Sequence, residues 1–149
     1  MRKMLADMTL PYPPSLNHYW RMNRGRVHIS EEGEKYLRLI RQLVFINGKS
    51  LYQDRFFVKK MAAVSGKKQQ LRVNAVFYLP DNARRDLDNL FKVIFDCMTK
   101  TGIWLDDSQV FEIRSSKILK RDHGSISGGQ VSMQVFSIYD PEEVPNDKF

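Results

Sequence analysis

The stretch LRVNAVFYLPDNARRDLDNLFKVIFDCM, residues 71–98, decides the fold because its periodicity changes in the middle. From Leu71 to Leu79 apolar residues recur at every second position, as in a β-strand with one buried face. Pro80 ends this strand because it lacks a backbone N–H. From Leu87 to Met98 the apolar residues fall on one helical stripe, and Gly102 supplies the stop. The stretch therefore predicts a strand that leads directly into a helix.

Patterns on both sides of this unit predict more elements of the same kinds. Ser30, followed by two glutamates, is typical of a helix start, and Asn47-Gly48 of a helix end. Residues 110–118 and 131–138 are predicted to be strands joined by a glycine-containing turn, and Met8-Thr9-Leu10 could end a short strand. We expect an α+β (mixed α/β) fold with a mixed sheet of about four strands packed by two main helices.

The chain is about the size of one ordinary domain, so residues 1–149 are expected to form a single compact unit. We find no repeat or interdomain linker in it. Residues 49–70 are predicted to be a surface connection, and residues 140–149 a frayed tail.

Composition narrows the class of partner and the compartment. The formal charge is +7 and the pI is near 9.6, which favours a polyanion such as nucleic acid or an anionic membrane. Apolar runs are too short to span a bilayer, and residues 1–7 have no apolar core that would suit a secretory signal. Cys97 is the only cysteine, so a disulfide within the chain and a thiolate-rich zinc site are excluded, and a buried core role is expected for it. A soluble protein of the reducing cytoplasm is predicted.

Two aspartates follow the predicted strand where it passes into the helix. Asp86 and Asp88 would diverge within a continuous helix, but both can face one spot across a strand-to-helix junction. Asp107 precedes the next predicted strand, and its neighbour Asp106 ranks below it as a turn residue or substitute ligand. If residues 110–118 pair beside residues 71–79, Asp107 could approach the other two and complete a pocket of three carboxylates.

Such a pocket suits Mg²⁺ or Mn²⁺, which take carboxylate, water and phosphate oxygens. A bound divalent cation would relieve repulsion between the carboxylates and could activate water for attack on a phosphodiester. Asp86 and Asp88 also have a simpler interpretation, because acidic residues near a helix N-terminus cap amides and complement the dipole. The adjacent pair Arg84-Arg85 favours the phosphate-binding interpretation over simple capping.

Lys92 lies four residues after Asp88 and four before Asp96, so the three share one helix face. These side chains could form a solvated ion-pair ladder. Alternatively, the Lys92 ammonium could reach a phosphate and help neutralise the transition state.

A basic segment lies ahead of the first predicted helix and has no clear periodicity, so we interpret it as a surface loop or loose hairpin. Its cations Arg21, Arg24 and Arg26 are candidates for contacts with DNA phosphates. Tyr19 and Trp20 could either stack on unpaired bases or fold back onto the core. The three histidines lack any ligand spacing, which argues against zinc.

Four blocks together show a resemblance to a known family: LPYPPS (10–15), NRGRVHIS (23–30), RRDLDNL (84–90) and GIWLDDSQV (102–110). In order and spacing they resemble the RusA family of Holliday junction resolvases over most of the chain. The resemblance implies a homodimeric endonuclease that uses magnesium, or manganese in its place, and makes paired nicks in branched DNA. Members of this family are frequently found in phages and prophages, and the nicking of branched DNA would serve recombination or repair.

The resemblance also implies which residues do the work. The catalytic, metal-holding carboxylates would be Asp86, Asp88 and Asp107, with Lys92 as a further catalytic residue. Two alternatives stay open: a basic DNA-binding module without catalysis, such as a phage regulator whose aspartates only cap helices, and a nuclease for flaps or single strands.

Overall fold

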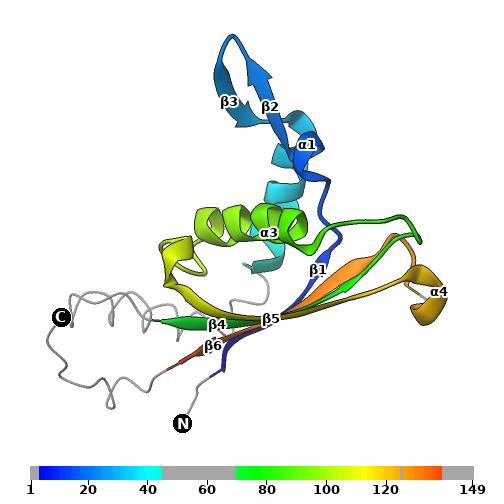
Figure 1. Cartoon of the computed structure of the whole chain (residues 1–149). Helices are drawn as coiled ribbons and strands as arrows, with labels where there is room; N and C mark the ends of the chain where they lie inside the picture. The colour runs from blue at the N-terminus through cyan, green and yellow to red at the C-terminus, as the bar shows by residue number, and fades with distance from the viewer. Residues whose placement is uncertain (1–3, 45–69, 125, 139–149) are drawn as a thin grey trace, which may run out of the picture.

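The computed structural model describes residues 4–44, 70–124 and 126–138 of the chain (Figure 1). Its main sheet has the strand order β1-β6-β4-β5. The four strands are β1 (Met4–Pro11), β4 (Leu71–Tyr78), β5 (Val110–Ile118) and β6 (Gln130–Ser137). β6 is antiparallel to β1 and to β4, whereas β4 and β5 are parallel. The predicted mixed four-stranded sheet is therefore confirmed.

Two longer helices lie on one face of this sheet (Figure 1). α3 (Leu87–Thr101) crosses over it, and a second helix is described over residues 31–44. Within the described residues there are also three short helical turns: α1 (Leu16–Tyr19), η1 (Asp107–Gln109) and α4 (Lys120–His123). The sequence patterns did not predict these short turns, because one turn has too few residues to show a period.

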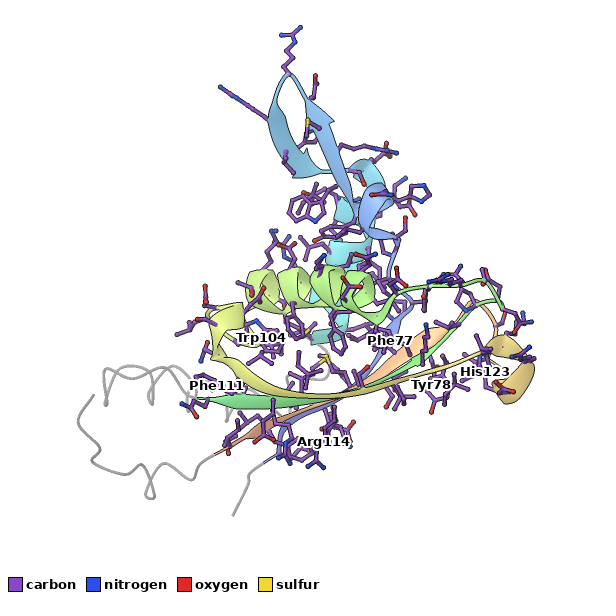
Figure 2. The ribbon with its side chains drawn as sticks, viewed as in Figure 1. Phe77, Tyr78, Trp104, Phe111, Arg114 and His123 are labelled. Atoms are coloured by element: carbon purple, nitrogen blue, oxygen red, sulfur yellow. The ribbon has the colours of Figure 1, made fainter. Side chains whose placement is uncertain are left out.

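The core lies between the sheet and the two longer helices. Alternate residues of β4 from Leu71 to Phe77 are buried on the helix side, and the predicted stripe of α3 packs against them. Phe77 and Phe91 meet edge to face, with ring centroids 5.2 Å apart. Figure 2 shows Phe77 pointing toward α3, whereas Arg114 points to the opposite side of the sheet. The period-two and helical patterns thus predicted the two faces that meet.

Local signals also explain where the elements begin and end. Ser30 caps the helix over residues 31–44, because its Oγ accepts a 3.0 Å hydrogen bond from the Gly33 amide. Gly102 ends α3 in the left-handed conformation, with φ at 77°. The predicted helix end at Asn47-Gly48 lies outside the described residues. So do the tail at 140–149 and the connection at 49–70, apart from residue 70.

The basic segment forms a hairpin that projects from the body of the molecule (Figure 1). Its strands are β2 (Trp20–Asn23) and β3 (Arg26–Ile29), paired antiparallel. The connecting residues Arg24 and Gly25 both have positive φ, 47° and 74°, which is the backbone of a tight two-residue hairpin turn. Of the two interpretations of this segment, the hairpin is the one observed.

Among the described residues, no helix combines the length and apolar character that crossing a membrane requires.

Candidate active site

Asp86 and Asp88 stand where the chain enters α3. Asp86 occupies the N-cap position in an extended conformation, and its carboxylate makes no capping hydrogen bond. Asp88 lies in the first turn, with Lys92 Nζ 3.6 Å from its Oδ2. Both aspartates are exposed, so their oxygens are accessible to a ligand. The simple capping interpretation is not supported for Asp86, because its side chain does not cap.

Asp107 lies beyond the other end of α3, at the start of η1. Its Oδ1 accepts hydrogen bonds from Thr99 Oγ1 at 2.6 Å and from Trp104 Nε1 at 2.9 Å. Trp104 is fully buried between the C-terminal end of α3 and the sheet, so its indole is a rigid donor (Figure 2). One oxygen of an exposed carboxylate is thereby fixed in orientation by the core.

The neighbouring Asp106 has a structural role. It caps η1 by accepting a 2.9 Å hydrogen bond from the Ser108 amide, while the Gln109 side chain accepts a hydrogen bond from the backbone amide of Asp106. Ranking Asp106 below Asp107 agrees with this arrangement.

The expectation of a three-carboxylate pocket within one chain is wrong. β5 does pair with β4, but the parallel register sets Val110 beside Leu71, at the end of β4 far from Asp86. Asp107 is tied to Thr99, which follows Asp88 by eleven residues on α3. At a rise of about 1.5 Å per residue the separation is roughly 16 Å, too far to share one ion. In residues 4–44, 70–124 and 126–138, no three potential ligands cluster for a metal.

Although they are far apart along the axis, these groups share one side of α3. Eleven residues are close to three full turns, so Asp88 and Thr99 lie almost in line along the helix, with Lys92 near that line. The Asp88 and Asp107 ends of the helix therefore mark two parts of one exposed strip.

A groove with a volume of ≈ 600 Å³ runs between α3 and the hairpin. It is lined by Leu16, Asn17, Trp20, Arg21, Met22, Val27, Lys92, Asp96 and Asp107. Two predicted catalytic residues, Lys92 and Asp107, thus share the groove with the predicted DNA contact Arg21. Arg24 and Arg26 are exposed at the hairpin end, away from the groove lining.

Sequence patterns missed the contact that holds the hairpin against α3. The Tyr19 hydroxyl donates a 2.5 Å hydrogen bond to Asp96 Oδ2, and Lys100 Nζ lies 2.5 Å from Asp96 Oδ1. Lys100 also sits over the Trp20 ring, 5.0 Å from its centroid. Burial and then the bond to Asp96 raise the pKa of Tyr19, so its hydroxyl stays protonated.

Tyr19 is fully buried, which rules out the base-stacking role considered for it. Trp20 is half-buried and packs against the core. The only available signal was the helical spacing of Asp96 and Lys100, which pairs them with each other but does not identify Tyr19 as a partner.

The pair Arg84-Arg85 lies in the loop before α3, and the two arginines differ in their surroundings. The Arg85 guanidinium forms an ion pair with Asp81, with Nη2 2.8 Å from Oδ2, and lies 5.8 Å from the centroid of the Tyr12 ring. This hydrogen bond, with one from the Ala83 amide, lowers the pKa of Asp81 to about 2. Arg84 is exposed. Both lie near the Asp86 end of α3, where a phosphate would need cations.

Taken together, the fold and the site define a class. A cationic hairpin beside a groove that carries carboxylates and a lysine suits a protein that binds a nucleic-acid backbone and acts on its phosphodiesters. The family model for "Endodeoxyribonuclease RusA" matches residues 11–126. The chain belongs to the RusA endodeoxyribonuclease family.

Named relatives agree with this family. A "Crossover junction endodeoxyribonuclease RusA" of Shigella sonnei (strain Ss046) is 40% identical over 112 residues, covering 75% of this chain and 82% of the relative. A protein with the same name from Escherichia coli (strain K12) is 39% identical over the same shares. One from Enterobacteria phage 82 is 40% identical over 111 residues, covering 74% of this chain and 81% of the relative. The resemblance drawn from the four sequence blocks is confirmed.

Proposed function

We propose that this protein is a metal-dependent endodeoxyribonuclease that resolves Holliday junctions by paired hydrolysis of phosphodiester bonds. Its family and the names of its relatives support the reaction and the branched substrate. The observation that carries the proposal is the placement of Asp107 and Lys92 in one groove beside the cationic hairpin. Recombination and repair are the processes that generate this substrate, and we propose a cytoplasmic setting, with a phage or prophage origin suggested by one relative.

The candidate ligands fit a hard divalent cation. Asp86, Asp88 and Asp107 offer exposed carboxylate oxygens, the donors that Mg²⁺ and Mn²⁺ prefer. We propose Mg²⁺ as the natural ion, with Mn²⁺ able to replace it. When bound, such an ion supplies Lewis-acid stabilisation of a phosphodiester undergoing attack by water.

The chain's own residues would seat and polarise the DNA. Thr99 and Trp104 hold Asp107 in one orientation, so that little reorganisation is needed when a ligand binds. Lys92 provides a positive charge within the groove that can approach a phosphate oxygen. Arg21, Arg24, Arg26, Arg84 and Arg85 would contact the backbone of the junction arms.

The separation of the carboxylates supports a homodimer. A two-fold axis perpendicular to α3 would set a second copy of this helix antiparallel to the first. Asp86 and Asp88 of one protomer would then approach Asp107 of its partner, and the same contact would form twice. Two equivalent composite sites would suit a junction, which needs two strands cut.

The edge of the sheet offers a surface for such pairing. β5 is the last strand of the sheet and has no second strand partner among the described residues. Next to that edge are large exposed apolar side chains: Leu105 at 49% exposure, Phe111 at 61% and Ile113 at 48%. Exposed apolar residues on an open edge are typical of a surface that another chain covers.

A labelled four-way junction tests the proposed reaction against a matched duplex of the same sequence. We expect paired nicks in the junction with Mg²⁺, none with EDTA, and little cutting of the duplex. Junction binding without nicks under every metal condition would favour a non-catalytic DNA-binding module. Preferential cutting of flaps or single strands in parallel lanes would change the substrate but leave the chemistry.

Removing a candidate ligand should separate chemistry from binding. Asp86→Asn and Asp107→Asn are each expected to abolish cutting while junction binding persists, because the cationic surface is unchanged. Asp106→Asn is the matched control, since asparagine can still cap η1 and cutting should continue. Gel-shift and cleavage assays on the same preparations measure both properties, and normal turnover in Asp107→Asn would remove that residue from the site.

A further inference from the structure

The hairpin presents an apolar pair that core packing does not explain. Met22 and Val27 are direct cross-strand partners in β2 and β3. They are 76% and 62% exposed, whereas Trp20 and Ile29, on the same face nearer the base, pack against the core. The exposed pair therefore extends the apolar face of the hairpin beyond the body of the protein.

The hairpin is built to hold this pair in place. At its outer end, Arg24 and Gly25 form a tight turn with positive φ at both positions. At its base, the Ser30 amide donates to the Tyr19 carbonyl at 2.8 Å, and the Tyr19 hydroxyl is bonded to Asp96 of α3. A short arm with an anchored base and a tight turn at its tip can hold side chains at a defined position (Figure 1).

Charge on the rest of the hairpin indicates what the pair meets. The opposite face carries Arg21, Arg26 and His28, and residues 20–29 contain no acidic side chain. Met22 and Val27 also line the groove that holds Lys92 and Asp107. An apolar wedge flanked by cations matches proteins that insert side chains between DNA base steps, and it matches poorly a surface for a second copy of a chain with net charge +7.

We propose that Met22 and Val27 form a wedge that contacts bases at the branch point and opens the base step beside the phosphate to be cut. This inference rests on the proposed junction-cleaving function. Base pairs that flank a branch have incomplete stacking, so they are opened at lower cost than pairs within a duplex. The wedge would favour branched over linear DNA without reading any particular base.

The test uses a four-way junction with 2-aminopurine beside the branch, because the fluorescence of this base increases when it unstacks. Without metal, the wild-type protein should bind and raise the fluorescence. The double variant Met22→Ala/Val27→Ala should bind through its unchanged arginines but produce little rise. With Mg²⁺, its cleavage should fall by about tenfold or more, on the scale of one unstacked base step, and recover on a junction whose branch-flanking pairs are mismatched.

Met4→Ala is the matched control, because Met4 is also exposed, at 48%, but lies on β1. It should behave as wild type in fluorescence and cleavage. Sedimentation of all variants gives the oligomeric state, and circular dichroism checks folding.

Each remaining outcome has a distinct meaning. Normal fluorescence and cleavage in the double variant would overturn the wedge, as would wild-type cleavage without any rise in fluorescence. A double variant that loses its dimer would show that the pair packs against a second copy instead. Absence of wild-type cleavage with metal would contradict the proposed function itself, independently of the wedge.

Discussion

Asp107 shows how the core of this protein can orient the side chain of an exposed acidic residue. Its Oδ1 accepts from a buried indole and from a hydroxyl, and these two donors also contact each other, Trp104 Nε1 lying 2.9 Å from Thr99 Oγ1. These three hydrogen bonds fix the orientation of the carboxylate without placing a positive charge beside it, since both donors are uncharged. A ligand held this way keeps its second oxygen for other partners.

Trp104→Phe should lower the affinity for the metal ion more than it lowers the stability of the fold. Phenylalanine keeps most of the buried ring but loses the N–H donor to Asp107. We expect the Mg²⁺ concentration for half-maximal cleavage to rise by about 10-fold or more. Metal titration of junction cleavage measures this. Phe95→Leu, which changes an aromatic contact of Trp104 but no hydrogen bond to Asp107, is the control and should leave the titration midpoint in place.

Asp81 gives a pH prediction at the same scale. Its pKa is lowered to about 2, first by the hydrogen bond from Arg85 and then by that from the Ala83 amide. Because the pKa of Asp81 in the folded protein lies below the usual 3.8, the contribution of the ion pair to stability is fully present above that value. It is lost as the pH falls toward about 2. Carboxyl NMR titration should show a midpoint near 2 in the wild type.

Arg85→Gln should move this midpoint upward, toward the usual value, while the bond from Ala83 keeps it slightly lower. Arg84→Gln, one residue away, should leave it unchanged. An unchanged midpoint in Arg85→Gln would mean that the Asp81 and Arg85 side chains are not paired in solution.

Among the elements, the sequence predicted those with long patterns well. The strand from Leu71, the helix from Leu87 and the strand over residues 110–118 occur within about one residue of their expected bounds, since each repeats its period several times. Met8-Thr9-Leu10 were expected to end a short strand, and they do lie at the end of β1. The start of β1 at Met4 was not predicted, because Asp7 and Thr9 lie on the outer face and interrupt the apolar run.

The order of the elements also predicts the direction of the strands. One helix between two neighbouring strands returns the chain to its starting end, so residues 71–79 and 110–118 must run parallel. Asp107, just before the second strand, then lies one helix length from Asp88. The distance between Asp88 and Asp107 could therefore have been predicted from the sequence. The Tyr19–Asp96 contact could not, because it joins residues 77 positions apart and has no local pattern.

Gly33 reveals how tightly the second helix approaches the base of the hairpin. A Cβ at this position would lie 2.7 Å from the Tyr19 carbonyl oxygen and 2.6 Å from Ile29 Cγ2. In an open helix, Gly→Ala stabilises by about 1 kcal/mol. Here the backbone contact reverses the sign, and we expect Gly33→Ala to lower the free energy of unfolding by about 1–3 kcal/mol.

Urea unfolding with circular dichroism measures this change. Arg38→Ala, at an exposed position of the same helix, is the control and should change stability by no more than about 0.5 kcal/mol. A more stable Gly33→Ala protein would mean that the helix and the hairpin base can separate, contrary to the close packing.

At the scale of the whole molecule, the separation of the carboxylates is the reason for proposing a homodimer. Within one chain, Asp88 and Asp107 lie at opposite ends of α3, about 16 Å apart along its axis. In the proposed dimer, each protomer would supply half of each of two sites. Activity should therefore depend on protein concentration, and the two halves should be separable by mutation.

Mixing two inactive variants tests this directly. Asp88→Asn and Asp107→Asn should each be inactive as homodimers. In a mixed dimer, the protomer that retains Asp88 faces the one that retains Asp107, so one site is intact and the other has neither group. After equimolar exchange of subunits, about half of the dimers are mixed and about a quarter of all sites are restored. Junctions should then receive single nicks rather than paired cuts.

The control mixture combines Asp86→Asn with Asp88→Asn. Both substitutions lie at the same end of α3, so no pairing of protomers rebuilds a complete site and the mixture should stay inactive. Nicking by the first mixture but not the second can arise only if the two ends of the helix act across the protomer boundary. If neither mixture nicks although subunit exchange is shown by mass, each site must be assembled within one chain. Asp107 would then have to leave Thr99 and Trp104 to reach Asp88.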